Sequence, residues 1–384
     1  MPRDRALLEE CRSLQDALRR HATLADLTGA SGSPALERRL ERVLFAPRVT
    51  PAPAGAAPHA GGTLRAVHWN IEHGNRYEEV ERALTSHPRL AGADLVLLNE
   101  VDLGMARAGN RDVTADLAAA LGLHAVFAPL FIETTAGRDD DPVAAAGREN
   151  EEGLFGIAVL SRHPFRKLRI VPLPGPLEIQ FDREGMWGRH AALVATIERP
   201  GAPFTAVSVH LEVHRTRARR AAQMRALMEA LTDDAGPVVL AGDFNSHTFD
   251  RGRPFDRLAS GLALTLTPSS GLTARLRHPD RGPHHEPLFD ELAGAGFDWH
   301  RFNDREGTLQ LRLGRLDEVN SLPLPLRHLA PELFRWAERR ARLRLDWFAG
   351  RGWRGGRGFT VGGLDGPGRA SDHAPIVAEL EPPS

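Results

Sequence analysis

The sequence has very little cysteine, with Cys11 as the single thiol among 384 residues. One thiol forms no intramolecular disulfide and cannot supply the several sulfur ligands of a cysteine zinc site. No apolar run approaches the roughly twenty residues that cross a membrane. The first residues carry charge throughout and lack the apolar segment of a signal peptide. We therefore expect a soluble, cytoplasmic protein without stable membrane insertion.

Net charge is nearly absent as well, because 49 Lys and Arg residues face 50 Asp and Glu residues. This balance argues against attachment to nucleic acid or membrane through charge over the whole surface, and leaves a local basic patch open. Lys167 is the single lysine. An arginine guanidinium is well suited to bind phosphate. The general richness in Ala, Arg, Gly and Pro, however, favours the base composition of the coding DNA as the cause of the excess of arginine over lysine.

The chain contains no P-loop, no GxGxxG cradle at the start of a helix and no internal repeat. Short strand-like runs recur instead, at 64–72, 93–102, 156–161, 190–198, 204–211, 238–245, 343–350 and 374–380. Helical patterns occur at 76–88, 113–122, 215–233, 285–299 and 328–342. Many short strands with few helices between them favour two packed, mainly antiparallel β-sheets flanked by helices, a four-layer α/β sandwich.

The chain is expected to have three parts. Apolar residues at helical spacing predict an N-terminal helical extension over 1–46, and a Pro-, Ala- and Gly-rich stretch predicts a linker over 47–62. The main domain then covers 63–382. About a hundred residues separate Asn245 from Asp346, which exceeds an ordinary loop. This part is therefore expected to hold structure of its own, including a helical insertion at about 315–342.

Polar residues stand at the ends of several predicted strands. They are Asn70, Glu100, His210, Asp243, Asn245, Asp346, Asp372 and His373. Asp243 and Asn245 are two positions apart and so share one face of their strand. Strand ends meet at a rim, where α/β proteins build their sites. We therefore expect these side chains to form one pocket.

The predicted pocket is rich in oxygen donors, with one Glu, three Asp and two Asn beside two His. Such donors suit Mg²⁺, with Mn²⁺ as the alternative, whereas zinc usually recruits more imidazole or thiolate. A divalent cation beside aspartate and histidine can hydrolyse a phosphate ester, because the cation neutralises phosphoryl oxygens while a carboxylate aligns water.

The ordered series WNIEHG, LLNEVD, LSRHPF, SVHLE, GDFN, RLDWF and SDHAP resembles the endonuclease/exonuclease/phosphatase superfamily. Its members include deoxyribonucleases, abasic-site endonucleases, neutral sphingomyelinases and inositol polyphosphate phosphatases. The resemblance covers about residues 63–382, and the stretch 97–122 is similar to a bacterial branch. It implies a two-sheet catalytic domain and metal-dependent phosphoester hydrolysis.

The resemblance also implies roles for the residues around the metal. Glu100 is implied as the main magnesium ligand, with Asn70 beside it, and Asp372 as a ligand directly or through water. Asp243 is implied to position or activate the attacking water. Asn245 is implied to orient the phosphate or that aspartate.

On the phosphate side, the resemblance implies that His373 contacts the scissile phosphate while Asp346 fixes its tautomer. His210 stands where the superfamily has a second residue that faces phosphate. Further implied contacts to phosphate or sugar are Arg107, Asn110 and Arg111. Many relatives have Asn where this chain has Ile157, a departure that concerns substrate contacts.

Ordinary structural roles stay open for some of these residues. Asp346 also fits one half of a buried ion pair, and His210 fits a core histidine bonded to backbone. Structural or solvated roles are favoured for His68, His73, His214 and His247. The stretch RGWRGGRGF, 351–359, invites comparison with RGG segments that bind single strands, but a loop is favoured.

We expect a Mg²⁺-dependent phosphodiesterase in which water attacks in line with the leaving group. Candidate substrates are nucleic acid, a nucleotide, and a phospholipid or inositol phosphate. The alternative is a non-catalytic binding or scaffold protein on the same fold. Such descendants usually lose metal ligands, whereas every principal ligand type is present here.

Overall fold

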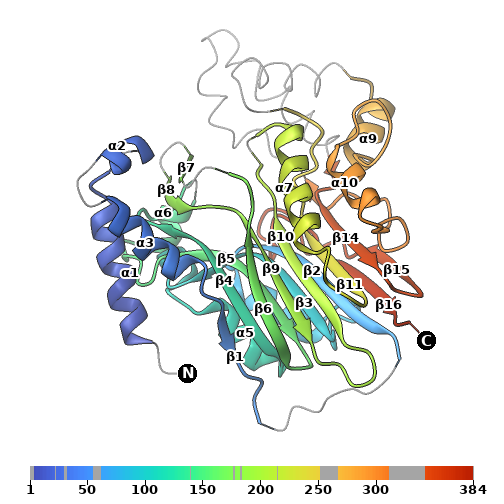
Figure 1. The fold of residues 1–384 in the computed structure, drawn as a ribbon, viewed down its shortest axis with the longest axis horizontal. Coiled ribbons are helices and arrows are strands. Elements are labelled where there is room, and N and C mark those ends of the chain that lie inside the picture. The colour runs from blue at the N-terminus through green and yellow to red at the C-terminus, as the bar shows by residue number, and fades with distance from the viewer. Residues whose placement is uncertain are drawn as a thin grey trace.

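The computed structural model describes residues 4–21, 23–29, 33–54, 62–138, 140–175, 178–181, 184–213, 215–250, 267–310 and 342–383. Two large β-sheets pack face to face, with helices on their outer faces (Figure 1). The predicted fold class, two mainly antiparallel sheets flanked by helices, is confirmed. Residues 311–341, which contain most of the insertion predicted at about 315–342, lie outside the described residues.

The larger sheet has the strand order β15-β16-β2-β3-β5-β4-β8-β7, and β1 pairs with β4. Its strands are β1 (Arg48–Thr50), β2 (Leu64–His73), β3 (Leu95–Leu103), β4 (His124–Glu133), β5 (Leu154–Ser161), β7 (Glu178–Phe181), β8 (Glu184–Gly188), β15 (Gly355–Thr360) and β16 (Ile376–Glu381). β2 and β3 are parallel to each other, and the other pairs are antiparallel. The central strands are buried on both faces, which explains their nearly continuous apolar runs.

The smaller sheet has the order β14-β11-β10-β9-β6. Its strands are β6 (Phe165–Pro172), β9 (Ala191–Ile197), β10 (Phe204–His210), β11 (Val238–Asp243) and β14 (Asp346–Arg351). β10 and β11 run parallel, and β14 pairs antiparallel to β11 so that Asp243 faces Asp346. The register of these strands therefore brings two predicted site residues to the same edge.

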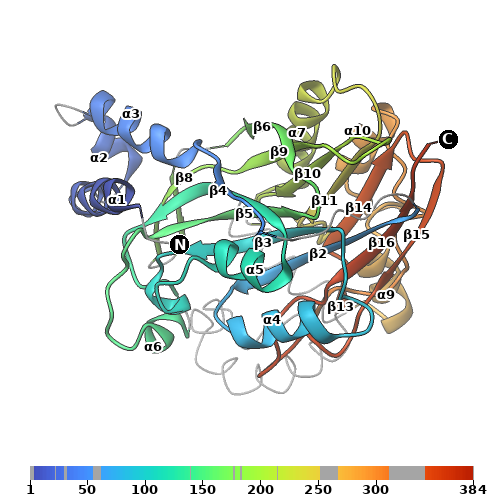
Figure 2. The ribbon, with the colours of Figure 1, turned by 90° about the horizontal axis from the view of Figure 1, so that it is seen from below.

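Helices cover the outer face of each sheet, giving four layers (Figure 2). α4 (Tyr77–Ser86) and α5 (Val113–Leu121) pack on the larger sheet, while α7 (Arg217–Ala230) and α10 (Leu288–Gly294) pack on the smaller one. Strand alternation divides the core between layers, since Leu97 faces the second sheet and Leu98 faces the helices. Other helical segments are η1 (Ala106–Ala108), α6 (Asp141–Ala145) and α9 (Ser269–Arg277). In the described parts of the chain, none of these helices combines the length and apolar character needed to span a bilayer.

The N-terminal helices share the core of the main domain. They are α1 (Arg5–Leu18), α2 (Leu24–Gly29) and α3 (Ser33–Leu44). Leu14 and Leu18 are fully buried in one cluster with Ile132 and Trp187, and Gln15 Nε2 donates a hydrogen bond to the Glu151 carbonyl oxygen at 2.9 Å. Part of the predicted linker forms β1. Helical periodicity identifies the apolar face of a helix but does not say which part of the protein packs against it. The packing of these helices on the main domain was therefore not predicted.

Truncating a buried side chain of α1 should therefore destabilise the whole protein. We expect Leu14→Ala to lower the free energy of unfolding by about 2–5 kcal/mol, the usual cost of removing a fully buried leucine side chain. Urea unfolding followed by circular dichroism measures this. Val143→Ala is the control, because that side chain is exposed. Equal midpoints for the two variants would contradict the shared core.

Some strands were not predicted, and local sequence explains why. β4 contains Pro129, which normally argues against a strand and here coincides with a register shift. β6 is an edge strand that carries charged residues. The stretch 351–359, predicted to be a loop, forms the end of β14, a turn and most of β15 at the edge of the larger sheet. A charged side chain such as Arg357 suits an edge strand.

Candidate active site

The predicted polar residues gather at one edge of the two sheets, around the carboxyl ends of β2, β3, β10 and β11. The pairing of β2 with β3 shifts register between Asn70 and His73, and that of β3 with β5 shifts between Leu98 and Val101. Glu100 has φ 52° and Asn245 has φ 49°, a conformation uncommon for residues other than glycine. Bulges and positive φ angles redirect side chains out of strand alternation and concentrate at functional sites.

Asn70 connects the two central carboxylates. Its Nδ2 donates hydrogen bonds to Glu100 Oε1 at 3.0 Å and to Asp243 Oδ2 at 3.3 Å. Its Oδ1 accepts from the Glu72 backbone N–H at 3.2 Å. The amide NH₂ group faces the two carboxylates and bridges them. Asn70 thus lies beside Glu100, as predicted, and its role as a metal ligand stays a prediction.

Asp243 is held by backbone and amide groups. Its backbone N–H donates to Asn99 Oδ1, and its Oδ1 accepts from the Asn245 N–H, both at 2.8 Å. The Asn245 side chain donates to the Leu211 carbonyl oxygen at 2.7 Å. One oxygen of Asp243 is therefore fixed, and Oδ2 is turned toward Asn70 and the site histidines. Asn99 was missed in the sequence, although it directly precedes Glu100.

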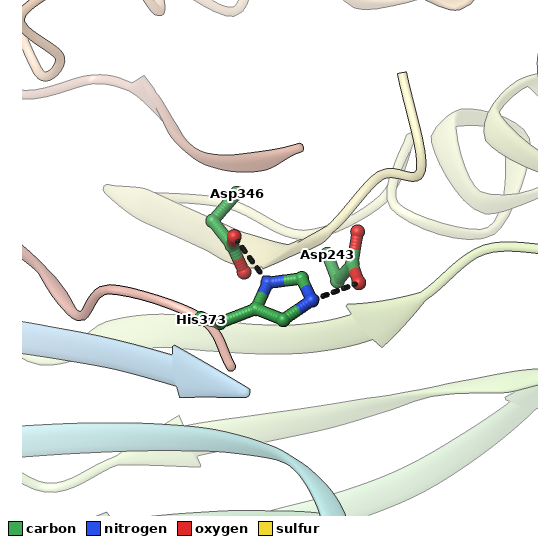
Figure 3. Close-up of side chains that lie close together, drawn as sticks. All are labelled: Asp243, Asp346 and His373. Atoms are coloured by element: carbon green, nitrogen blue, oxygen red, sulfur yellow. Dashed lines mark hydrogen bonds and ion pairs between the residues drawn. The ribbon is translucent and has the colours of Figure 1, made fainter. Parts of the chain in front are cut away.

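Asp346 lies between two histidines, all three being buried. His373 Nδ1 donates to Asp346 Oδ2 at 2.8 Å, and His68 Nε2 donates to Asp346 Oδ1 at 2.9 Å. On the other side of the His373 ring, Nε2 lies 3.8 Å from Asp243 Oδ2 (Figure 3). The structure thus brings the predicted Asp346 and His373 together. The structure also brings His68 to this group, although a structural role was favoured for it. Its position two residues before Asn70 in the sequence could have indicated a place in the site.

The surroundings of His373 and Asp346 favour the charged form of each group. Burial opposes charge on both groups, yet the carboxylates of Asp346, Asp372 and Asp243 raise the pKa of His373 well above its ordinary value. Against the same burial, the charge and hydrogen bond of His373, joined by His68, lower the pKa of Asp346. Asp346 is therefore one half of a buried ion pair and also the partner that orients His373. The two interpretations given for Asp346, a buried ion pair and a partner that orients His373, therefore describe the same contact.

The chemistry of the donor set fits a divalent cation. Burial, reinforced by the charge of Asp372, raises the pKa of Glu100 to about 7, and the Asn70 hydrogen bond opposes that rise. Ligand atoms of Asp243, Asp346 and His373 lie within 4.8 Å of one another, but Asp346 and His373 are already occupied with each other. The oxygens of Glu100, with Asp372 nearby, are therefore the better donors. Their surplus negative charge is what a cation would neutralise.

Two further imidazoles face the same carboxylates. His210 Nε2 lies 3.7 Å from Asp243 Oδ2 and 4.0 Å from Glu100 Oε1. His73 Nε2 lies 3.7 Å from Glu100 Oε2. Burial lowers the pKa of both rings and so favours their neutral forms. His210 was predicted as a site residue, whereas His73 was not, because strand alternation does not extend through the bulge.

Arg107 is not placed to bind substrate. Its side chain is completely buried. Its Nε donates to Asp102 Oδ2 at 2.8 Å, and its Nη1 donates to Glu133 Oε2 at 3.1 Å and Asp141 Oδ2 at 3.2 Å. These carboxylates hold the guanidinium inside the protein, which corrects the prediction that Arg107 lines the cleft.

Removing this buried cation should destabilise the fold. We expect Arg107→Met to lower the free energy of unfolding by about 3–5 kcal/mol, because three carboxylates lose their shared counter-charge. Chemical unfolding measures the loss. Arg107→Lys, which keeps the charge, should recover part of the stability. A methionine variant as stable as the parent would show that the cluster is not held by charge.

The remaining predicted contacts lie in other surroundings. Asn110 Nδ2 donates to the Glu149 carbonyl oxygen at 3.0 Å. Arg111 pairs with Glu78 at 2.7 Å on the surface, so the structure does not bring it to the carboxylates. Ile157 is buried between the two sheets. His214 lies outside the described residues.

The sequence of residues 67–373 matches the model of the Endonuclease/Exonuclease/phosphatase family. No curated protein sequence matches the chain. Similar solved structures include an endonuclease/exonuclease/phosphatase from Beutenbergia cavernae, with 19% identity and a TM-score of 0.49 over 83% of this chain and 72% of that one. An AP endonuclease from Archaeoglobus fulgidus has 13% identity and a TM-score of 0.46 over 83% and 99% of the two chains.

Proposed function

Because the chain belongs to the endonuclease/exonuclease/phosphatase family, whose enzymes hydrolyse phosphoester bonds and generally use divalent metal ions, we propose that it cleaves a phosphodiester with the help of such an ion. The observation that carries this proposal is the surroundings of Asp243 Oδ2. Asn70 donates to this oxygen, while His210 and the charged His373 lie within 3.8 Å of it. A carboxylate oxygen close to two imidazoles suits proton transfer next to a phosphate.

The cation would be held by Glu100, with Asp372 contributing directly or through water, while Asp243 faces the attacking water. Oxygen donors of this kind accept Mg²⁺, with Mn²⁺ as the alternative. When bound, the ion supplies charge for the phosphoryl oxygens and acidifies a water molecule.

The chain's own residues then divide the remaining work. Asp243 Oδ2 orients the attacking water and accepts its proton, because the other oxygen is fixed by the Asn245 backbone N–H. His373 donates from Nε2 to a phosphoryl oxygen, and its charge is maintained by Asp346. Asn70 keeps the Glu100 and Asp243 carboxylates side by side against their mutual repulsion. Together these residues place a positive charge and a proton acceptor beside the same phosphate.

A metal-supplemented substrate panel tests the proposal. The arms are bis-p-nitrophenyl phosphate, single- and double-stranded DNA, RNA, a dinucleotide and phospholipid vesicles, each with Mg²⁺ and with Mn²⁺. We expect EDTA to abolish hydrolysis and excess metal to restore it. The arms also separate nucleic acid from nucleotide and lipid substrates. Absence of hydrolysis in every arm, with metal bound, would favour the non-catalytic binding protein instead.

A further inference from the structure

The Asp346 carboxylate binds two imidazole rings, one through each of its oxygens. His373 Nδ1 lies 2.8 Å from Oδ2, and His68 Nε2 lies 2.9 Å from Oδ1. His68 belongs to β2, and its side chain is fully buried. The steps proposed above use His373 and Asp346 but give no task to His68. The bond from His68 to Asp346 is therefore the part of this group whose purpose has still to be explained.

The contact with Asp346 also fixes the place of the proton on the His68 ring. An ionised carboxylate only accepts hydrogen bonds, so Nε2 of His68 carries a proton. The other ring nitrogen, Nδ1, is buried and has no hydrogen-bond partner among the residues that the structure describes. A buried polar atom without a partner is unfavourable. What His68 contributes to this part of the protein is therefore the hydrogen bond from Nε2 to Asp346.

Two bonds to one carboxylate also fix its orientation. The backbone N–H of Asp346 donates to Thr308 Oγ1 at 3.2 Å, and the bonds to His68 and His373 assign one oxygen to each ring. Without His68, the carboxylate would be free to turn about its Cβ–Cγ bond, and the His373 ring would tilt with it. His373 Nε2 lies on the far side of that ring, 3.8 Å from Asp243 Oδ2. The direction of Nε2 therefore depends on the bond that His68 makes.

We propose that His68 is a positioning residue for the reaction, which acts through Asp346 to keep His373 Nε2 directed at the phosphate beside Asp243. This proposal rests on the proposed function, in which His373 donates from Nε2 to a phosphoryl oxygen. His68 itself has no exposed surface with which to touch the substrate. Its effect on the reaction is transmitted by the carboxylate, as it is for the partners that orient metal-bound histidines.

Steady-state kinetics of two substitutions at one position test the positioning role. His68→Leu removes the donor, and we expect kcat to fall by about 10–100-fold, the usual effect of losing a group that orients another, with little change in KM. His68→Gln keeps an N–H donor near the place of Nε2 and should retain most of the activity. His163→Leu is the matched control, because His163 is equally buried and its Nδ1 also lacks a partner in the described residues. It follows β5, whose last residue pairs with the start of β3, far from Glu100.

Nuclear magnetic resonance of the full chain with ¹⁵N-labelled histidine gives a readout that needs no substrate. In the parent protein we expect the His68 proton on Nε2 and a low-field resonance from the His373 Nδ1 proton in its bond to Asp346. His68→Leu should shift or remove the His373 resonance. His68→Gln should return it close to its position in the parent protein, and His163→Leu should leave it where it is. A role confined to stability would not move this proton selectively.

A parent spectrum with His68 Nε2 unprotonated would overturn the proposal, and this result does not depend on the folding of any variant. Folded His68→Leu protein with the kcat of the parent, or with the His373 resonance unmoved, would overturn it as well. These outcomes differ from failure of the proposed function. If no substrate were hydrolysed while the His373 resonance followed the expected pattern, the phosphodiesterase would be rejected and the positioning of His373 by His68 would stand.

Discussion

Asp243→Asn is expected to lower kcat for phosphodiester hydrolysis by about 10³-fold, within the range that general-base groups contribute. The variant is nearly isosteric, and its amide oxygen can still accept from the Asn245 backbone N–H, as Oδ1 does now. What it loses is the negative charge and the proton affinity of Oδ2, which faces Asn70, His210 and His373. A loss in kcat with little change in KM would identify an interaction made in the transition state.

Steady-state kinetics on bis-p-nitrophenyl phosphate and on the best substrate of the panel provide the measurement. Asp233→Asn is a matched control, because Asp233 is exposed after α7 and should leave kcat unchanged. Circular dichroism should show the same folded spectrum for both variants. An Asp243→Asn enzyme within tenfold of the parent would remove Asp243 from the reaction.

Asp346→Asn should damage both catalysis and stability. Asp346 is the buried acceptor for His373 and for His68, and an amide offers one acceptor oxygen where the carboxylate offers two. His373 then loses its counter-charge and its fixed orientation. We expect kcat to fall by about 10³–10⁴-fold, as in other histidines deprived of an orienting aspartate. The free energy of unfolding should fall by about 3–5 kcal/mol, the cost of breaking a buried ion pair.

Kinetics and urea unfolding of the same preparations separate the two effects. Asp290→Asn is the control, because Asp290 pairs with His285 on the surface and should change neither quantity. Full activity in Asp346→Asn protein that has lost stability would show that His373 acts without its partner. Unchanged stability would contradict the buried ion pair.

Much of the site was predictable because its residues stand at strand ends. Asp243 ends a run of buried apolar residues, and Asp346 begins the strand paired with it. Such positions can be predicted from the alternation of side chains along a strand and from the order of the motifs in the chain, both of which are visible in the local sequence. His68 carried a usable signal too, since it precedes Asn70 by two positions on β2 and so shares its face.

Other parts of the site depended on contacts that no local pattern contains. Arg107 was expected to contact phosphate or sugar, yet Glu133 and Asp141 come from separate segments and pair with its buried side chain. His73 reaches Glu100 because the backbone bulges after Asn70. The N-terminal helices could be predicted as helices, but their burial against the larger sheet could not.

From the sequence alone, the two-sheet sandwich and the set of ionisable groups at its rim were determined, because side-chain alternation and motif order are local properties of the chain. Only the tertiary structure decided which nitrogen atoms form hydrogen bonds with which oxygen atoms in the site. Asp346 bonds to His68 across 278 positions of the chain, and Asn70 turns its amide hydrogens toward two carboxylates. Contacts of this kind depend on packing to a fraction of an ångström, since hydrogen-bond and ligand distances tolerate no more.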